Sequence, residues 1–213
     1  DLNSDYEAVY GRKRNAETRR ANRRKDARLA ELGGLRFYEP ETKEELHAAI
    51  DVMLDHKVKR LAENGVHGVF DAEEHRMIHM LAEAEEAGKR LFTTHVLSLD
   101  ETVLAVTFGG WLDETYWFYI SSLAPNSAAT KHSPGDFALR ETIKACCAGG
   151  LKTFDFGAGA AAYKVGWTDT IMSLHGILRS NGLAGIPWVL AQYAKLNLLA
   201  LIKRNPNLRD LAF

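Results

Sequence analysis

Residues 131–167 read KHSPGDFALRETIKACCAGGLKTFDFGAGAAAYKVGW, and this stretch decides the predicted fold. A Ser-Pro-Gly start predicts a helix over 135–148, and a short buried strand follows over 153–156. A glycine-rich bend and a Tyr-Lys pair come next. This order places the amino end of a helix beside the carboxyl end of a strand. Helix starts bind anions, and open α/β sheets bind ligands beyond the carboxyl ends of their strands. The stretch therefore predicts the part of a transferase that binds its cofactor.

Three strands are predicted immediately before this stretch. The period of the apolar residues changes from 3.6 to 2 over 91–99, 103–111 and 115–123. The turns between these segments are short, so the strands form an antiparallel meander. We expect the sheet to open between the strand over 115–123 and the strand over 153–156.

The amino-terminal third predicts helices. Thr42 with Glu45 and Asp71 with Glu74 are capping-box patterns, and each begins a helix with an apolar face. The first of these helices should end near residue 64, and the second should end at Gly88. A strand is expected before them over 35–38.

The two ends of the chain carry further elements. Residues 5–32 are charged, lack proline and include a basic run, which predicts one long solvated helix. After a short helix over 160–167, we expect a strand over 171–178 and an amphipathic helix over 185–203. The fold class is thus α/β, with a mixed, mostly antiparallel sheet flanked by helices and a long amino-terminal helix.

Composition sets limits on the partners and on the compartment. The chain has 213 residues and a formal net charge of −1, which predicts no bulk attraction to nucleic acid or membrane. Cys146 and Cys147 are the only cysteines and are adjacent in the sequence, so a disulfide is not expected and we interpret both as small core residues. The lack of a disulfide framework favours a reducing cytoplasm. No apolar run has the length of a membrane span. The chain begins with Asp1, so we expect a piece of a longer polypeptide.

The element order and the motif residues together resemble a known family. The chain is similar to the GNAT acyltransferase fold and, within it, to the CelD-like acetyltransferase group of cellulose biosynthesis, related to the FemAB and FemX aminoacyl transferases. The resemblance implies that 35–213 form a GNAT-like domain and that 1–34 form a basic connecting helix. It also implies that this is the carboxyl-terminal half of a two-domain protein. The residues that carry it are Ser133, Pro134, Gly135, Gly150, Asp155, Phe156, Gly157, Gly159, Tyr163, Lys164 and Trp167.

The resemblance implies an acyltransferase, but the donor stays open. An acyl-CoA, in particular acetyl-CoA, would supply the acyl group to an amine or sugar hydroxyl of a small molecule or glycan precursor, in envelope or exopolysaccharide synthesis. The short Ser-Pro-Gly start leaves aminoacyl transfer from charged tRNA as an alternative. A non-catalytic half that forms a homodimer, or that binds a missing amino-terminal half, is a third hypothesis.

Two groups of site residues are predicted. Three residues are the catalytic candidates. Lys164 would stabilise the oxyanion, Tyr163 would donate a proton to the leaving thiolate, and Asp155 would orient the lysine. Asp155 could also serve as a base, and the competing interpretation of these residues is a structural ion pair or cap. No metal site is predicted, since His75 and His79 lack the glutamate and third ligand of a zinc motif. The predicted donor-binding residues are Ser133, Pro134, Gly135, Gly157 and Gly159, although Ser133 could simply cap a helix.

Overall fold

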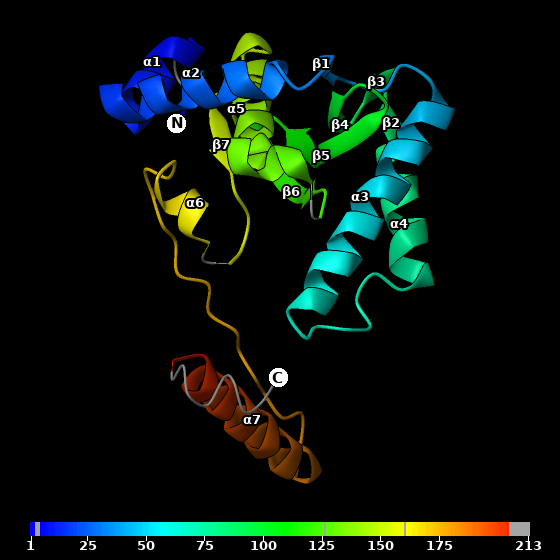
Figure 1. Cartoon of the computed structure of the whole chain (residues 1–213). Helices are drawn as coiled ribbons and strands as arrows, with labels where there is room; N and C mark the ends of the chain where they lie inside the picture. The colour runs from blue at the N-terminus through cyan, green and yellow to red at the C-terminus, as the bar shows by residue number, and fades with distance from the viewer. Residues whose placement is uncertain (3–4, 126, 160, 205–213) are drawn as a thin grey trace. The chain divides into compact units, whose positions relative to one another are not determined.

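The computed structural model describes residues 1–2, 5–125, 127–159 and 161–204. The chain divides into two compact units, Asp1–Asp169 and Thr170–Phe213. The first unit holds the sheet and most of the helices, and the second holds η2 (Leu183–Gly185) and α7 (Ile186–Arg204) (Figure 1). No described helix is both long and apolar enough to cross a bilayer.

The sheet has five strands in the order β1-β4-β5-β6-β7. The first three pairings are antiparallel and the pairing of β6 with β7 is parallel, as the mixed, mostly antiparallel sheet predicted. The strands are β1 (Leu35–Tyr38), β4 (Phe92–Leu99), β5 (Thr102–Leu112), β6 (Thr115–Leu123) and β7 (Thr153–Asp155). The apolar pattern located β4, β5 and β6 to within a residue or two. Only β6 alternates between buried and exposed residues, whereas the middle residues of β4 and β5 are buried on both faces of the sheet.

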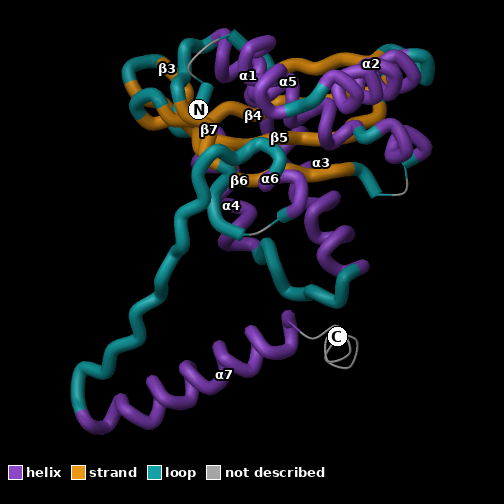
Figure 2. Tube along the Cα trace, turned by 90° about the vertical axis from the view of Figure 1, so that its left-hand side faces the viewer, coloured by secondary structure: helices purple, strands orange, loops and turns teal. Residues whose placement is uncertain are grey.

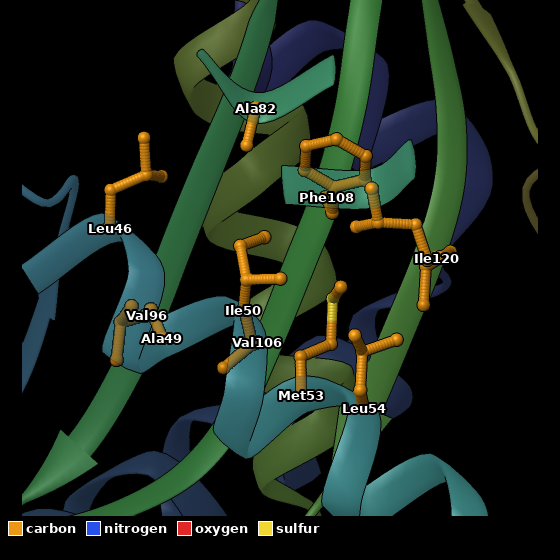
Figure 3. Packing of buried hydrophobic residues seen from close by; sticks show 11 residues of the cluster. Leu46, Ala49, Ile50, Met53, Leu54, Ala82, Val96, Val106, Phe108 and Ile120 are labelled. Atoms are coloured by element: carbon orange, nitrogen blue, oxygen red, sulfur yellow. The ribbon is translucent and has the colours of Figure 1, made fainter. Parts of the chain in front are cut away.

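Two layers of helices cover the sheet (Figure 2). α3 (Lys43–Glu63) and α4 (Ala72–Ala82) cover one face, and α5 (Pro134–Ala148) covers the other with α1 (Tyr6–Lys13) and α2 (Ala16–Ala30). Figure 3 shows the first layer, where Ile50, Met53 and Leu54 of α3 meet Phe108 and Ile120 of the sheet. Burying each such side chain contributes about 1.5–3 kcal/mol, so α3 is held firmly to the sheet.

The helix starts are set by local caps. The Asp71 side chain accepts from the N–H groups of Glu73 and Glu74, and the Glu74 carboxylate accepts from the Asp71 N–H, which completes the predicted capping box. Thr42 accepts from the Glu45 N–H, but the Glu45 carboxylate accepts from Glu41 instead, so only half of that box forms.

The predicted long amino-terminal helix is wrong. The helix breaks between α1 and α2, where Arg14 is extended and the Asn15 side chain caps α2 by accepting from the Thr18 N–H. The Arg14 guanidinium donates to the Gly166 carbonyl at 2.5 Å and lies 4.4 Å from the Trp167 ring centroid. This contact with a residue far along the chain draws Arg14 out of helical geometry.

Three further segments differ from the predictions. The strand predicted over 171–178 does not form, and residues 171–180 have no regular structure. α4 ends at Ala82, and β2 (Glu85–Glu86) with β3 (Lys89–Arg90) forms a small hairpin where helix was expected to continue. The predicted helix over 160–167 is the single turn α6 (Ala162–Val165), and Ala160 lies outside the described residues.

Candidate active site

The sheet splits between β6 and β7. Only Thr115, Tyr116 and Trp117 of β6 pair with β7, so three of its nine residues are joined. The pairing ends at Asp155, and among the described residues 118–123 have no strand partner on that edge. All three residues of β7 pair with β6, so β6 continues past the end of β7, and the opening of the sheet between these strands stays a prediction. Backbone groups of β6 are therefore available beyond the carboxyl end of β7, where α/β sheets bind ligands.

A β-bulge lies at the start of the split. Phe108 pairs with Ile120 but Gly109 pairs with Phe118, which leaves Tyr119 as the extra residue of β6. A bulge bends its strand and releases backbone groups from the ladder. A Cβ on Gly109 would lie 2.5 Å from the Trp117 carbonyl oxygen and 2.6 Å from the Tyr116 ring, so glycine is required here. The glycine within the strand pattern was a readable signal of this bulge, and our sequence interpretation missed it.

The loop after β7 is held by two charged side chains. The Asp155 carboxylate accepts from the Gly157 N–H at 2.6 Å, and Lys164 Nζ donates to the carbonyls of Phe156 at 2.7 Å and Ala158 at 3.0 Å. Gly157 has a φ of +66°, which glycine adopts without strain. Asp155 and Lys164 thus both bind the loop backbone, and no ion pair joins them within the described part of the chain. These hydrogen bonds agree with a structural cap, which is one half of the competing interpretation, and not with an ion pair, which is the other half.

Tyr163 reaches across this loop to β6. Its side chain is 45% exposed, and its ring meets the Phe156 ring edge-on at a centroid distance of 6.3 Å. Partial burial raises the pKa of the Tyr163 phenol, and a hydrogen bond with the Ser121 side chain lowers it by a smaller amount. The phenol is therefore protonated at neutral pH and can donate a proton beside the free edge of β6.

The start of α5 lies beside the end of β6. A Cβ on Gly135 would be 3.7 Å from Leu123, which places the Ser133–Gly135 segment next to the last residue of that strand. Ser133 is the N-cap residue of α5, as the interpretation as a helix start expects, but it has a φ of 57° and its side chain makes no capping hydrogen bond. Its carbonyl accepts from the N–H groups of Asp136 and Phe137, and Pro134 has no N–H. The first turn thus leaves the Gly135 N–H without a backbone partner among the described residues.

Lys25 adds a cation at this helix start. Its ammonium donates to Ser133 Oγ at 3.0 Å, so the basic helix α2 contributes directly to the corner. A positive charge here compensates for the few backbone N–H groups that this short start presents to an anion. Sequence reasoning identified the basic run but had no signal for which of its residues would lie here.

A buried polar network fixes α2 against α5. Arg140 is 6% exposed and donates to both oxygens of Asp26, at 3.0 and 2.6 Å, and to Asp136 at 2.9 Å. Asn22 donates to Asp136 at 3.2 Å and to the Tyr10 hydroxyl at 2.9 Å. Burial alone would lower the pKa of Arg140, but the two carboxylates raise it above its ordinary value. Since Asp26 follows Lys25 directly, this network positions the lysine.

α3 carries two residues whose pKa values are lowered. Burial lowers the pKa of Lys57, and the charges of Arg60 and Lys164 lower it further, so these three cations lie near one another. Burial also lowers the pKa of His56, whose Nδ1 is buried without a partner in the described structure. His56 is therefore neutral at pH 7 and can accept a proton. The sequence pattern marked these α3 residues only as the polar face of a helix.

Other groups take no part in this arrangement. Burial raises the pKa values of Cys146 and Cys147, so neither thiol is ionised at neutral pH. Two surface cavities lie away from the split, one of about 370 Å³ beside Arg20 and Arg24 and one of about 620 Å³ beside Met77 and Met80. The described residues contain no group of three or more His, Cys, Asp or Glu that could hold a metal ion.

A protein-family comparison identifies this arrangement. The model of the acetyltransferase (GNAT) domain matches residues 16–165. The chain belongs to this family. The match covers the split sheet, α5 and the loop with Lys164, so the GNAT domain contains each of the predicted site residues. The resemblance seen in the sequence is confirmed at the level of the GNAT domain. No protein of the curated set matches the sequence.

Solved structures of acetyltransferases resemble the GNAT domain at low identity. A possible acetyltransferase from Clostridium difficile 630 is 13% identical, with a TM-score of 0.48 over 68% of this chain and 99% of that chain. An aminoglycoside acetyltransferase from an uncultured soil metagenomic sample, in complex with trehalose, is 11% identical, with a TM-score of 0.48 over 72% and 99%. A predicted acetyltransferase with acetyl-CoA from Clostridium acetobutylicum is 11% identical, with a TM-score of 0.46 over 67% and 96%.

Proposed function

We propose that this GNAT domain transfers an acetyl group from acetyl-CoA to an amine or a sugar hydroxyl, within the split between β6 and β7. The observation that carries the proposal is the register of these two strands: β7 ends after three pairs, beside a bulge, and leaves residues 118–123 of β6 without a strand partner on that edge. A free strand edge can hydrogen-bond an extended, amide-containing donor in the way that a further strand would.

The donor-binding role falls to the two segments that flank β6. At one end, the Gly135 N–H and the Lys25 ammonium offer a charge-assisted site for a phosphate. At the other end, Gly157 lies beside the Phe118 carbonyl and lets a ligand approach the backbone. Ser133, Pro134 and Gly159 would shape these segments, as the sequence predicted. The residues present therefore fit an acyl-CoA donor.

Acyl transfer needs a base for the acceptor and an acid for the departing thiolate. Tyr163 is the candidate acid because its raised pKa keeps the phenol protonated. Such groups typically contribute 10²–10⁴-fold each.

Lys164 and Asp155 have more indirect proposed roles. Each binds the backbone of the 156–158 bend, so together they hold the loop against β6. Lys164 also brings a positive charge to the split, which would stabilise the oxyanion that develops during transfer. We therefore propose Lys164 as a loop anchor with an electrostatic contribution, and Asp155 as a positioning residue.

Isothermal titration of the full chain with acetyl-CoA tests the donor. We expect one site with micromolar to millimolar affinity that weakens in Lys25→Ala and is unchanged in Lys144→Ala, which alters an exposed lysine of α5. Absence of heat at millimolar acetyl-CoA would contradict the proposed donor.

Aminoacyl transfer from charged tRNA is the second candidate. It is favoured by the first turn of α5, which offers a single free backbone N–H, and by Arg20 and Arg24, which border a cavity on α2. Retention on aminoacyl-tRNA resin but not on CoA resin would select this candidate. A chain that binds neither donor and self-associates would instead support the third hypothesis, a non-catalytic half.

Finer assignments rest on the sequence motif. We propose membership of the CelD-like group related to FemAB, a glycan-precursor acceptor in envelope or exopolysaccharide synthesis, and a cytoplasmic location. We also propose that 1–34 connect the 35–213 domain to an amino-terminal half or to a second copy. Assaying acetyl transfer to aminosugars, neutral sugars and free amines separates N- from O-acylation and tests the acceptor class.

A further inference from the structure

The residues that follow α6 pack against the segment before α2. The Arg14 guanidinium donates to the Gly166 carbonyl at 2.5 Å and lies 4.4 Å from the centroid of the Trp167 ring. The Tyr10 ring stacks with the same indole at a centroid distance of 6.0 Å. Trp167 is only 4% exposed, so the cation and the indole meet largely out of water, where such a contact is strongest. We call these four residues, Tyr10, Arg14, Gly166 and Trp167, the Arg14 clamp.

Two further contacts join the same parts of the chain. Lys13 donates to the Asp169 carboxylate, and the Leu2 N–H donates to the carbonyl of Lys152, directly before β7, at 2.6 Å. The GNAT domain model matches residues 16–165, so the clamp and the Lys13–Asp169 pair join residues that lie beyond the two ends of that match. The clamp is therefore a feature of this chain beyond what the family model describes.

The helix α6 depends on its neighbours for its position. It is a single turn, Ala162–Val165, and an isolated turn is not stable by itself. On one side, the Lys164 ammonium binds the loop after β7. On the other side, the Lys164 carbonyl accepts from the N–H groups of Trp167 and Thr168, at 2.9 and 3.0 Å. A shift of Trp167 is therefore passed directly to the turn that carries Tyr163.

Gly166 leaves the space that the guanidinium occupies. A Cβ at this position would lie 2.9 Å from the nearest nitrogen of Arg14. The backbone of Gly166 has a φ of −70° and a ψ of −12°, which alanine adopts as readily as glycine, so conformation does not require a glycine here. Glycine instead allows the close approach of Arg14 to the backbone after α6.

We propose that Arg14 is a positioning residue of the candidate active site. By holding Gly166 and Trp167, it keeps α6 against β6 and the Tyr163 phenol beside Ser121. The inference rests on the proposed function, in which Tyr163 is the acid that protonates the departing thiolate. It assigns a part in turnover to a segment that our sequence interpretation treated as a connecting helix.

Turnover and donor affinity, measured on the same variants of the full chain, test this role. Turnover is followed as release of the CoA thiol from acetyl-CoA with the acceptor that reacts fastest. Arg14→Met should lower turnover at least ten-fold, because misplaced catalytic groups lose rate steeply. Its affinity for acetyl-CoA should stay within two-fold, because Lys25 at the start of α5 is untouched. Arg28→Met, which alters an exposed arginine of α2, is the matched control and should change neither value.

A second variant displaces Arg14 without removing it. Gly166→Ala places a methyl group against the guanidinium, whose side chain is flexible enough to move away. We expect a folded protein with turnover lowered at least three-fold and acetyl-CoA affinity unchanged. This variant decides the question if Arg14→Met does not fold, and full turnover of folded Gly166→Ala would then refute the positioning role.

A double-mutant cycle separates positioning from a general loss of stability. If Arg14 acts through the phenol, adding Arg14→Met to Tyr163→Phe should lower turnover by less than two-fold further. A ten-fold loss that persists without the phenol, or full turnover of folded Arg14→Met, would overturn the inference while leaving the proposed function in place. If the unchanged chain transfers acetyl to no acceptor, the proposed function itself fails, and the inference fails with it.

Discussion

The buried network around Arg140 should control both stability and donor binding. Replacing Arg140 by Met keeps much of the side-chain volume but removes the cation that Asp26 and Asp136 share. The two carboxylates would then face each other across the junction of α2 and α5. Because Lys25 precedes Asp26, loosening α2 should also displace the lysine from Ser133.

The expected cost follows from burial. Breaking a buried ion pair by removing one partner typically costs about 3–5 kcal/mol. The Arg140 side chain is 8% exposed, but Asp26 and Asp136 are 24% and 33% exposed, so water can partly solvate the carboxylates left behind. We therefore expect the lower end of that range, about 3 kcal/mol, which for a domain of this size lowers the melting temperature by roughly 6–12 °C.

Thermal and urea unfolding, with acetyl-CoA titration below the melting temperature, measure these effects. Lys144→Met is the matched control, since this exposed lysine of α5 has only a 3.4 Å pair with Glu141 and should change stability by less than about 0.5 kcal/mol. Adding Asp26→Leu to Arg140→Met should restore part of the loss, because one unpaired carboxylate is removed. If Arg140→Met is no worse than the control, the network does not hold α2 to α5 and our explanation of the Lys25 position fails.

Four other outcomes are expected. Gly109→Ala should lower the free energy of unfolding by about 1–3 kcal/mol or more, because the new Cβ meets the Trp117 carbonyl; an unchanged melting temperature would contradict the bulge geometry. Tyr163→Phe should lower turnover by about 10²-fold with acetyl-CoA affinity nearly unchanged, and full turnover would exclude the phenol as the acid. Lys164→Ala should lower turnover by about 10²-fold. It should also lower the melting temperature, since the hydrogen bonds from Lys164 to two backbone carbonyls are lost. A normal melting temperature would contradict the anchoring role of Lys164. The hydrogen bond from His95 lowers the pKa of Glu39, so the stability that the Glu39 carboxylate contributes is present above about pH 4.5 and is lost as the pH falls through the lowered pKa. Glu39→Gln should therefore flatten the acidic part of a profile of unfolding free energy against pH. An unaltered profile would show that the Glu39–His95 pair is not responsible.

The elements predicted well are those whose signals are local. Alternation over 115–123 reports β6 because a half-buried strand exposes every second residue, and Asp71 starts α4 through bonds within its own first turn. The mixed sheet could be inferred because the element order resembled that of a known family. These features need no knowledge of which distant residues meet.

The failures arise where distant residues decide the local structure. The break at Arg14 combines a local signal, the Asn15 cap, with contacts to Gly166 and Trp167 about 150 residues further along the chain, and only the first lies in the nearby sequence. The segment 171–178 has strand-like residues, but a strand forms only where an edge accepts it. The placement of Lys25 at Ser133 likewise depends on the Arg140 network and not on the basic run itself.

The Tyr-Lys pair shows how far a motif can be interpreted. Sequence placed Tyr163 and Lys164 together after the glycine bend, and adjacency suggested that both act on the reacting groups. On the short helix α6 they point to different partners, Lys164 to the carbonyls of Phe156 and Ala158 and Tyr163 to Ser121 of β6. A cation that already donates to two carbonyls is restrained, whereas a protonated phenol on a free strand edge can give up its proton. The geometry therefore favours Tyr163 for proton transfer and Lys164 for keeping the loop, and with it the phenol, in place.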